Sequence, residues 1–514
     1  MREEIAAAGV ELLRSRFDVD VDLESPLEEI IGDYDAIVIR SATKLTAELL
    51  EHADKLKVIG RAGVGVDNVD VAAATRKGIV VANAPDSTVV SAAEHTIGLL
   101  VALARNIPQA HAALKQGRWE RSRWGGVELA DKTLGVLGFG RIGRQVARRA
   151  LGLGMRVVGY DPFVVPDRFR ELGADHAETA EQVLAVADFL TLHLPLTEET
   201  RGFLGPAALA HVRPGVRIVN AARGELVDEA ALAEAIRSGR VAGAALDVFS
   251  TEPYTGELLQ LDAVVVTPHL AASTGEAQDR AGVIVAEQVV AALEGGLVTN
   301  AVNIPVVRAE DLELLGPFIP LAARLGRLAV ELAGGQPRRI ALAYNGALAE
   351  HDTRLLTVAA LNGAFEGRVE QAVNYVNAPL IAAERGIEVT EERSTTARDY
   401  TNLVSVTVDG VEVSGTTVGP EHRHFLAAAL GFGIDLQLSP RMVFFRYADV
   451  PGVIGRVGTM FGASGVNIAN MAVSRTKEGG EALMALSIDS APPAELLERV
   501  RGEGFDDARF IVLG

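Results

Sequence analysis

Cysteine is absent from this chain of 514 residues. Its absence excludes disulfide bonds, thiol catalysis and zinc sites built on cysteine. Aromatic residues are also scarce, at 5% of the chain, although 48% of the residues are hydrophobic. Alanine and valine therefore supply much of the apolar fraction. That mix suits α/β layers, in which strands are rich in valine and helices pack closely through alanine and glycine.

An excess of positive charge and long apolar runs are lacking as well. The 49 basic residues are outnumbered by 68 acidic ones, so the formal net charge is −19. Such a chain is a poor candidate for binding nucleic acid or an anionic membrane, and an anionic substrate would need a local basic pocket. The longest uncharged apolar stretch, around residues 96–104, is too short to cross a bilayer, and the first residues lack the apolar core of a signal peptide. We therefore expect a cytoplasmic protein, and the length predicts three or four domains.

Short apolar runs alternate with helical patterns between residues 35 and 300. This alternation predicts βαβ units in two parallel sheets, one on each side of a helix over residues 91–107. The runs predicted as buried strands are 36–40, 57–60, 78–83, 133–138, 156–161, 187–195, 217–222 and 263–269.

The rest of the chain has a different pattern. The charged stretch 308–315 is predicted to be a linker, and residues 316–435 read as mixed α+β without an active-site motif. His422 and His424 form an H-x-H pair there, but no third ligand is evident, so we interpret them as surface residues and predict no metal site. From about residue 440 the order strand, helix, strand, strand, helix, strand predicts a ferredoxin-like βαββαβ unit.

The strongest local motif is a glycine-rich turn that follows an apolar strand and opens a helix. It places Gly138, Gly140 and Gly143 in the pattern GxGxxG. The first glycine allows the tight turn, the second lets a pyrophosphate approach the backbone, and the third lets helix and strand pack closely. Asp161 ends the next strand, where its carboxylate can bind both ribose hydroxyls of NAD and repel a 2′-phosphate. The alternative is a glycine-rich turn without a ligand.

Three polar residues each follow a predicted strand: Arg223, Glu252 and His269. Ligands bind outside the carboxyl ends of strands in open parallel sheets, so we expect the three to meet at one edge. A cation can hold a carboxylate and polarise a carbonyl, an imidazole can move a proton, and a carboxylate can orient the imidazole. Taken singly, the three could instead be a surface ion pair, a helix cap and a structural histidine.

Five segments together resemble the D-2-hydroxyacid dehydrogenase family, in its order and spacing. They are residues 60–70, 134–144, 219–232, 242–253 and 267–274. The resemblance implies an α/β fold with a Rossmann-like NAD domain and a flavodoxin-like substrate domain, and it makes Arg223, Glu252 and His269 catalytic. The implied NAD contacts are Gly138, Gly140, Arg141, Ile142, Gly143, Asp161, Ala221, Ala222, Asp247, His269 and Ala272.

Within the family, residues 39–50 and 60–68 resemble the branch that acts on 3-phosphoglycerate. That resemblance implies that Arg40 and Arg61 bind the phosphate, because arginine can hold a phosphate through two hydrogen bonds. The substrate carboxylate would meet Arg223 and the backbone amides of Val64 and Gly65. The alternative is that Arg40 and Arg61 only pair with nearby acids such as Asp67.

The tail resembles the long form of these enzymes. Residues 442–471 resemble an ACT domain, a small module that binds amino acids, and Tyr447, Asp449 and Asn467 match positions that contact a serine effector. The alternative is that these three only cap a helix and a turn. Segments 361–367, 373–387 and 413–416 resemble the α+β intervening domain of the long forms.

The resemblance also sets the predicted boundaries and assembly. The predicted domains are 1–85 with 270–305 for substrate, 86–269 for NAD, 308–436 for the intervening domain and 438–514 for ACT. The family usually opens with a strand of about ten residues before the first helix. This chain begins inside that helix, so either its start was placed too late or the first sheet lacks a strand. We expect a homotetramer or dimer formed through the NAD and ACT domains.

Three functions remain open from the sequence. The first is NAD-dependent oxidation of 3-phosphoglycerate to phosphohydroxypyruvate in serine synthesis, with serine as effector. The second is another enzyme of the family, such as a glyoxylate, hydroxypyruvate or 2-oxoglutarate reductase. The third is a non-enzymatic NAD-sensing binding protein. Arg40, Arg61 and the long tail favour the first over the second, and the acidic charge argues against the third.

Overall fold

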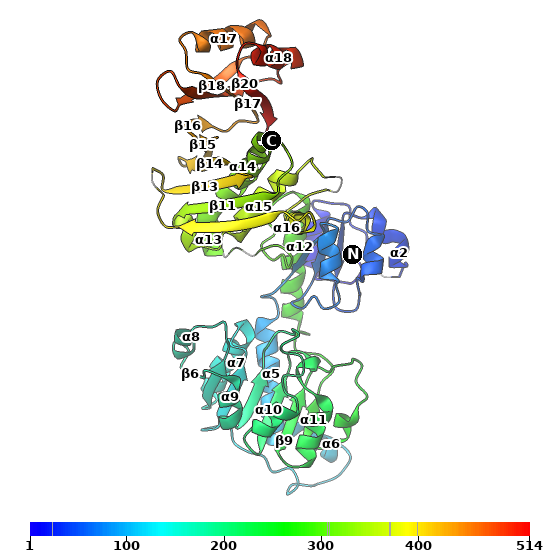
Figure 1. The fold of residues 1–514 in the computed structure, drawn as a ribbon. Coiled ribbons are helices and arrows are strands. Elements are labelled where there is room, and N and C mark those ends of the chain that lie inside the picture. The colour runs from blue at the N-terminus through cyan, green and yellow to red at the C-terminus, as the bar shows by residue number, and fades with distance from the viewer. Residues whose placement is uncertain (23, 306, 308, 370–371, 398, 514) are drawn as a thin grey trace.

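The computed structural model describes residues 1–22, 24–305, 307, 309–369, 372–397 and 399–513. These residues form four β-sheets, which succeed one another along an elongated molecule (Figure 1). The predicted boundaries at residues 308 and 514 lie outside the described residues. In the part of the chain that is described, no helix is long and apolar enough to cross a membrane.

The domain predicted to bind substrate, called the substrate domain below, is built on a small parallel sheet. Its order is β1 (Ala36–Ile39), β2 (Val58–Arg61), β3 (Val80–Asn83). Helix α1 packs so closely on α12 that a Cβ on Gly9 would lie 2.5 Å from the carbonyl oxygen of Gly282. The residues before α1 form no strand, but the amide of Arg2 donates to the carbonyl of Val38 at 3.0 Å. The helices here are α1 (Ala7–Arg14), α2 (Leu27–Ile30), α3 (Ala47–Glu51), α4 (Val71–Arg76) and α12 (Gly275–Leu293).

The NAD domain contains a seven-stranded sheet in the order β10-β9-β8-β7-β4-β5-β6. All its strand pairs are parallel, and the order reverses direction between β4 and β7, which is where such folds bind ligands. The strands are β4 (Thr133–Leu137), β5 (Arg156–Tyr160), β6 (Asp175–His176), β7 (Phe189–Leu192), β8 (Val216–Asn220), β9 (Val241–Leu246) and β10 (Val264–Val266). The helices are α5 (Val89–Arg105), α6 (Ile107–Lys115), α7 (Arg141–Gly152), α8 (Pro166–Arg170), α9 (Ala180–Val186), α10 (Pro206–His211) and α11 (Glu229–Arg237).

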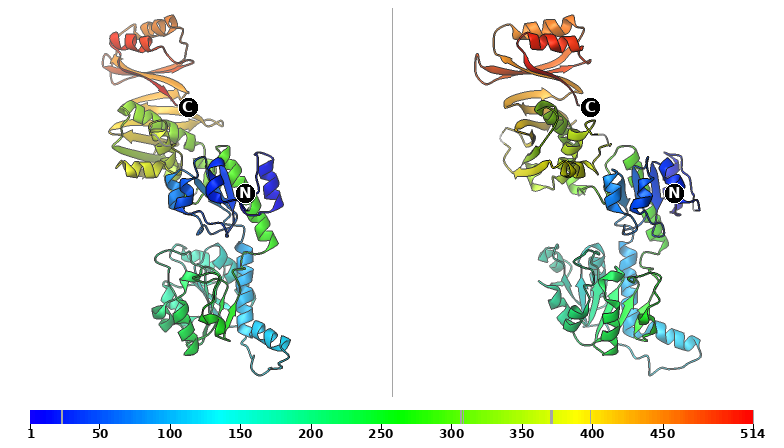
Figure 2. Two further views of the ribbon diagram at one scale, coloured as in Figure 1. Left: turned by 90° about the vertical axis from the view of Figure 1, so that its right-hand side faces the viewer. Right: turned by 45° about the vertical axis from the view of Figure 1, so that its right-hand side comes forward.

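The helix predicted over residues 91–107 is α5, which ends two residues before the predicted end. Helix α5 ends at Arg105 because Asn106 adopts a left-handed conformation with φ of 49°, and α6 then starts in a new direction. The second helix and the loop after it form an arm that projects from the NAD domain (Figure 2).

The intervening domain has a six-stranded sheet in the order β12-β11-β13-β14-β15-β16, in which only the β11–β12 pair is parallel. Glycines let α14 and α15 approach closely, since a Cβ on Gly363 would lie 1.9 Å from the carbonyl oxygen of Ala323. The strands are β11 (Arg339–Gly346), β12 (Glu388–Ser394), β13 (Asn402–Val408), β14 (Val411–Val418), β15 (Arg423–Ala429) and β16 (Phe432–Gln437). The helices are α13 (Ala309–Leu315), α14 (Phe318–Ala333), α15 (Arg354–Phe365) and α16 (Ala378–Glu384).

Two predictions for this region need correction. The stretch predicted as a linker is mostly helix α13, because its apolar residues have a place to pack: Leu315 is buried in the domain core. Asp311 of the same helix is 2.8 Å from Nδ1 of His351. His424 is half-buried rather than on the surface, with Nδ1 3.2 Å from Arg324. Burial, together with the charge of Arg324, lowers the pKa of His424.

The ACT domain has the predicted βαββαβ order, with an antiparallel sheet β18-β19-β17-β20. Its elements are β17 (Arg441–Ala448), α17 (Val453–Ala463), β18 (Ile468–Arg475), β19 (Glu481–Ile488), α18 (Ala494–Gly502) and β20 (Asp506–Val512). One face of the sheet packs on α17 and α18 through residues such as Phe445. The other face, with Phe444 and Ile511, belongs to the same hydrophobic core as the intervening domain.

Candidate active site

The glycine-rich turn joins β4 to α7 and has the geometry of a pyrophosphate-binding loop. Gly138 has φ of 91°, and a Cβ there would lie 2.5 Å from the carbonyl oxygen of His193. At Gly143 a Cβ would lie 2.0 Å from the carbonyl oxygen of Gly138, whereas at Gly140 it would meet nothing within 4 Å. Two of the glycines are thus required by packing, and Gly140 leaves the backbone open to a phosphate at the start of α7.

Asp161 follows β5 beside this turn. One carboxylate oxygen accepts from the amide of Phe139 at 2.8 Å, and the other accepts from the amide of Phe163 at 2.9 Å. The carboxylate is thereby held against the glycine loop, where a ribose would lie. Arg168 is the nearby cation that could bind a 2′-phosphate, but its guanidinium group pairs with Glu171 at 3.0 Å. Arg141, at the start of α7, pairs with Asp86 at 3.3 Å.

The predicted acid–base pair is formed. Nδ1 of His269 lies 2.9 Å from Oε2 of Glu252, and Oε1 of Glu252 accepts from the amide of Phe249 at 3.1 Å. The His269 side chain is 50% exposed, and within the described residues no side chain bonds its Nε2. This leaves Nε2 available to a substrate hydroxyl, while Glu252 fixes the ring from the other side.

The turn that carries His269 is organised by a buried carboxylate, Asp247. The Asp247 side chain accepts from Thr267 Oγ1 at 2.6 Å and lies 3.1 Å from Nε2 of His95 on α5. It also accepts the amides of Leu270 and Ala271, at 2.7 and 2.8 Å. Burial acts to raise the pKa of Asp247, but these hydrogen bonds outweigh it and hold the pKa below its usual range.

Asp247 therefore has a positioning role in the structure. The amide of His269 donates to the carbonyl oxygen of Asp247 at 2.7 Å, and His269 itself has φ of 54°. The Asp247 side chain is fully buried among its own partners. Its predicted contact with NAD stays a prediction. Sequence reasoning missed His95, whose bond to Asp247 joins residues that are 152 positions apart.

Arg223 stands at the end of a turn after β8. The side chain of Asn220 braces this turn by donating to the carbonyl of Arg223 at 2.8 Å and accepting from the amide of Ala222 at 3.0 Å. The guanidinium group reaches the substrate domain, where Nε donates to Asp67 at 3.2 Å. Ala221 and Ala222, predicted to line the nicotinamide site, are half-buried in this turn, as is Ala272 in the turn after His269.

Arg61 lies opposite Arg223, at the end of β2. Its Nε is buried without a hydrogen-bond partner in the described structure. Burial, and after it the neighbouring charge of Arg223, lowers the pKa of Arg61, and Arg40 acts in the same direction. The alternative in which Arg40 or Arg61 pairs with Asp67 is not what the structure shows, since Asp67 pairs with Arg223 at 3.1 Å. A buried guanidinium nitrogen without an acceptor, beside two further arginines, suits an anion with several charges.

The loop after β2 completes this region. The side chain of Asn83 donates to the carbonyl of Val64 at 2.6 Å. Among the described residues, no acceptor reaches the amides of Val64 and Gly65. A Cβ on Gly65 would lie 2.2 Å from Nη2 of Arg223, so any side chain there would displace the guanidinium group from its present position. Free amides beside a guanidinium group form a suitable site for a carboxylate.

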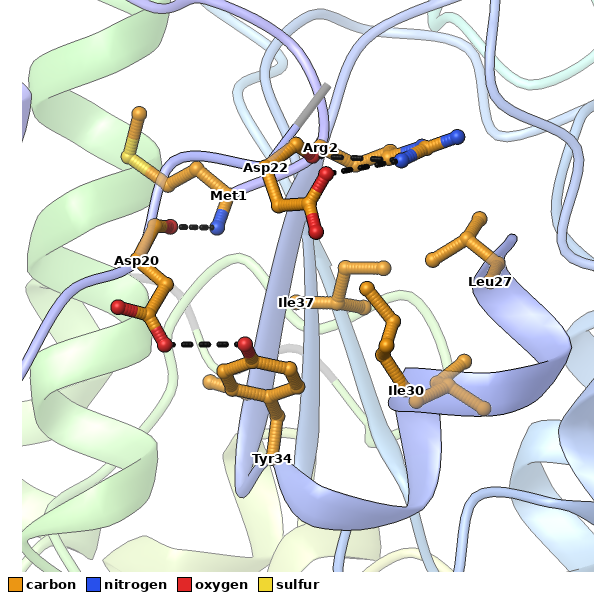
Figure 3. A pocket seen from close by; sticks show the side chains of 10 residues that line it. Met1, Arg2, Asp20, Asp22, Leu27, Ile30, Tyr34 and Ile37 are labelled. Atoms are coloured by element: carbon orange, nitrogen blue, oxygen red, sulfur yellow. Dashed lines mark hydrogen bonds and ion pairs between the residues drawn. The ribbon is translucent and has the colours of Figure 1, made fainter. Parts of the chain in front are cut away.

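A hollow at the other end of β1 is too small to be the substrate site. Figure 3 shows that it lies beside the start of β1, lined among others by Met1, Tyr34 and Ile37. The hydroxyl of Tyr34 donates to Asp20 across it at 2.9 Å. Its volume of about 30 Å³ leaves room for about one water molecule. This hollow therefore does not compete with the carboxyl ends of the strands as the place for a substrate.

The three predicted effector residues all have partners within the ACT domain. Asp449 pairs with Arg475 at 2.9 Å, and Nδ2 of Asn467 donates to Asp489 at 2.7 Å. Tyr447 is buried, and its ring packs near Phe505. Burial raises the pKa of the Tyr447 hydroxyl.

Comparison with known proteins agrees with this geometry. Three family models match: the NAD binding domain of D-isomer specific 2-hydroxyacid dehydrogenases at residues 97–271, the D-3-phosphoglycerate dehydrogenase intervening domain at 314–426, and the ACT domain at 441–505. These matches confirm the predicted NAD-binding domain and the intervening and ACT domains that follow it.

Relatives cover nearly the whole chain. The D-3-phosphoglycerate dehydrogenase of Archaeoglobus fulgidus is 42% identical over 99% of both chains. That of Methanocaldococcus jannaschii is 43% identical over 96% of this chain and 95% of its own.

Among solved structures, the TT0316 protein of Thermus thermophilus covers 58% of this chain and 97% of its own, at 34% identity and a TM-score of 0.53. A D-lactate dehydrogenase of Aquifex aeolicus, complexed with NAD and lactic acid, covers 57% of this chain and 95% of its own, at 30% identity and a TM-score of 0.52. The chain belongs to the D-3-phosphoglycerate dehydrogenase family, and it is an NAD-dependent oxidoreductase.

Proposed function

We propose that this protein oxidises 3-phospho-D-glycerate to 3-phosphohydroxypyruvate with NAD, as the first step of L-serine biosynthesis in the cytoplasm. The observation that carries the proposal is the pairing of His269 with Glu252 at 2.9 Å, together with the arginines at the end of β2 and after β8. Relatives named for this reaction, at 42–43% identity, support it.

The residues of the chain divide the chemistry among them. The glycine loop and Asp161 would hold NAD, which when bound would supply the hydride acceptor for the carbon that carries the substrate hydroxyl. His269 takes the hydroxyl proton on Nε2, and Glu252 stabilises the positive charge that the ring then carries. Because Nδ1 already faces Glu252, the ring needs no reorientation before it accepts the proton.

The substrate is proposed to be held at both ends. Arg223 exchanges Asp67 for the substrate carboxylate, which the amides of Val64 and Gly65 also bind. Arg61 and Arg40 take the phosphate, and the buried, unpartnered Nε of Arg61 gains an acceptor in this way. This unpartnered nitrogen, which a phosphate oxygen could satisfy through a charge-assisted hydrogen bond, is the strongest local reason to expect a phosphorylated substrate.

The test is NADH formation with 3-phosphoglycerate, and the reverse reaction with phosphohydroxypyruvate. Glyoxylate and 2-oxoglutarate serve as comparison substrates, since they carry the carboxylate but no phosphate. We expect the phosphorylated pair to be strongly preferred. A folded, full-length protein that reduces glyoxylate well but ignores phosphohydroxypyruvate would contradict the proposal.

We propose that L-serine regulates this activity from the ACT domain. Asp449 would hold the ammonium group and Asn467 the carboxylate or hydroxyl, with Tyr447 nearby. Serine would then compete with the present partners of the two side chains, Arg475 and Asp489. Calorimetric titration of serine into the wild type and Asn467→Ala tests this: equal binding in both excludes the pocket, and no binding to the wild type ends the serine hypothesis.

We also propose a homotetramer or dimer that assembles through the NAD and ACT domains. Three large apolar side chains on the projecting arm support this: Ile107, Leu114 and Trp119 are all exposed, Trp119 by 81%. Exposed apolar residues on a projecting segment favour contact with a second subunit. Light scattering of the wild type and Trp119→Asp would measure the assembly, and a monomeric wild type would exclude it.

A further inference from the structure

A loop of the intervening domain rests on the substrate domain at a single glycine. Nδ2 of Asn374 donates to the carbonyl of Gly78 at 2.6 Å. The other side-chain atom, Oδ1, accepts the amides of Val376 and Asn377, at 2.9 and 3.3 Å. Oδ1 of Asn377 in turn accepts the amide of Asn374 at 2.9 Å. The loop therefore presents a fixed donor to the substrate domain.

Gly78 is suited to receive this loop because it has no side chain. It has φ of 72°, and a Cβ there would lie 2.9 Å from Nδ2 of Asn377 and 3.0 Å from Nδ2 of Asn374. Any larger residue would strain the backbone and also displace these two amide groups. Gly78 stands just after α4 and just before β3, so its position is tied to that strand.

Strand β3 leads from this contact to the substrate loop. It is four residues long, and its last residue is Asn83, whose side chain donates to the carbonyl of Val64 at 2.6 Å. The strand is also fixed along its side: Val81 donates to Oδ1 of Asn303 at 3.0 Å, and Val302 donates to Val81 at 2.7 Å. A short strand held at both ends and along one side moves as a unit.

We propose that the intervening domain sets the position of the loop that binds the substrate carboxylate, and that Asn374 and Asn83 are the positioning residues at the two ends of β3. A shift of Gly78 moves β3, and Asn83 transmits the shift to Val64. This inference rests on the proposed function, because the carboxylate-binding role of the loop is part of it. Displacements well below 1 Å at a binding group alter affinity measurably.

Asn374→Asp tests the contact without removing the loop that carries it. The aspartate keeps an oxygen for the amides of Val376 and Asn377, but sets a second, charged oxygen against the carbonyl of Gly78. We expect the KM for 3-phosphoglycerate to rise about three- to tenfold. The KM for NAD and kcat should stay within about twofold of the wild type, since the NAD domain is untouched.

Gly78→Ala is the second variant, and Gly239→Ala is its matched control. Gly239 also follows a helix, has φ of 77°, and a Cβ there would meet nothing within 4 Å. Both variants should lower thermal stability through backbone strain, but only Gly78→Ala should raise the KM for 3-phosphoglycerate. Equal KM values in the wild type, Gly78→Ala and Asn374→Asp would overturn the inference, and so would an equal rise in Gly239→Ala.

Hydrogen exchange of the full chain separates this inference from the proposed function. The hydrogen-bonded amides around this loop, those of Ala62, Gly63 and Ala84, should exchange faster in Asn374→Asp than in the wild type, whether or not substrate turns over. If the wild type is inactive on 3-phosphoglycerate, the proposed function fails while this measurement still tests the contact. Unchanged exchange in Asn374→Asp would remove the positioning role.

Discussion

The substrate and NAD domains keep separate hydrophobic cores, whereas the intervening and ACT domains share one. Polar contacts join the first pair: Arg223 pairs with Asp67 at 3.1 Å, and Arg280 donates to the carbonyl of Ser87 at 2.9 Å. Apolar side chains join the second pair, including Phe444 and Ile511. Domains linked by polar contacts can rotate at little cost, whereas a shared core moves as one body.

The largest expected effect is on turnover, and it comes from a residue between the substrate and NAD domains. His269→Ala should lower turnover by about 10²–10⁴-fold, because the proton acceptor is lost, while NAD binding stays intact. His52→Ala, at an exposed position in the substrate domain, is the control. Turnover and NAD titration measure both effects. Turnover within a factor of ten of the wild type would remove His269 from the proposed mechanism.

Two adjacent phenylalanines test the shared core. Phe444 packs toward the intervening domain and Phe445 toward α17 and α18, and both are 1% exposed. Truncation of either to alanine should cost about 3–5 kcal/mol of unfolding free energy. Phe444→Ala should also weaken hydrogen-exchange protection in β13 and β14, whereas Phe445→Ala should not. If the loss in Phe444→Ala stays within the ACT domain, the two domains do not unfold together.

Cofactor choice gives a third, smaller effect, confined to the NAD domain. The wild type should prefer NAD to NADP at least tenfold, because Asp161 would face the 2′-phosphate without a compensating cation. Asp161→Ser should reduce the preference for NAD over NADP while leaving the KM for 3-phosphoglycerate unchanged. Equal use of both cofactors by the wild type would contradict the role of Asp161.

The smallest effect concerns the contact between the first two domains. Asp67→Asn removes the carboxylate that competes with substrate for Arg223, a half-exposed pair of the kind worth about 0.2–1 kcal/mol. The KM for 3-phosphoglycerate should fall about two- to fivefold, and the difference should shrink in high salt. An increase in KM would show that Asp67 supports the substrate loop instead of competing for Arg223.

The site residues that follow the ends of strands could be predicted from the sequence. Glu252 and His269 could be predicted to meet because both follow strands of one parallel sheet, and the structure brings them together. His95 and Asp67 could not be predicted from the pattern, because each acts on a residue more than a hundred positions away. The break after Arg105 depends on one left-handed residue, Asn106, which the helical periodicity does not reveal.

The shared core did have a signal in the sequence. Residues 442–445 of β17 are all apolar, and a strand that is apolar at successive positions buries both of its faces. The ferredoxin-like pattern accounts for only one covered face, so the second face required a neighbour. The helix over Ala309–Leu315 was missed because its charged residues resemble a solvated segment, although Leu315 is buried.

The hydrophobic core that the intervening and ACT domains share limits how the ACT domain could be transferred to another protein. A designer who wishes to place amino-acid control on another enzyme would not succeed by grafting residues 441–513 alone, because that piece would carry Phe444, Leu483 and Ile511 uncovered into solvent. The smallest transferable cassette begins near helix α13 and runs to β20. A host would also have to offer an acceptor to the loop at Asn374, which in this chain donates to the carbonyl of Gly78.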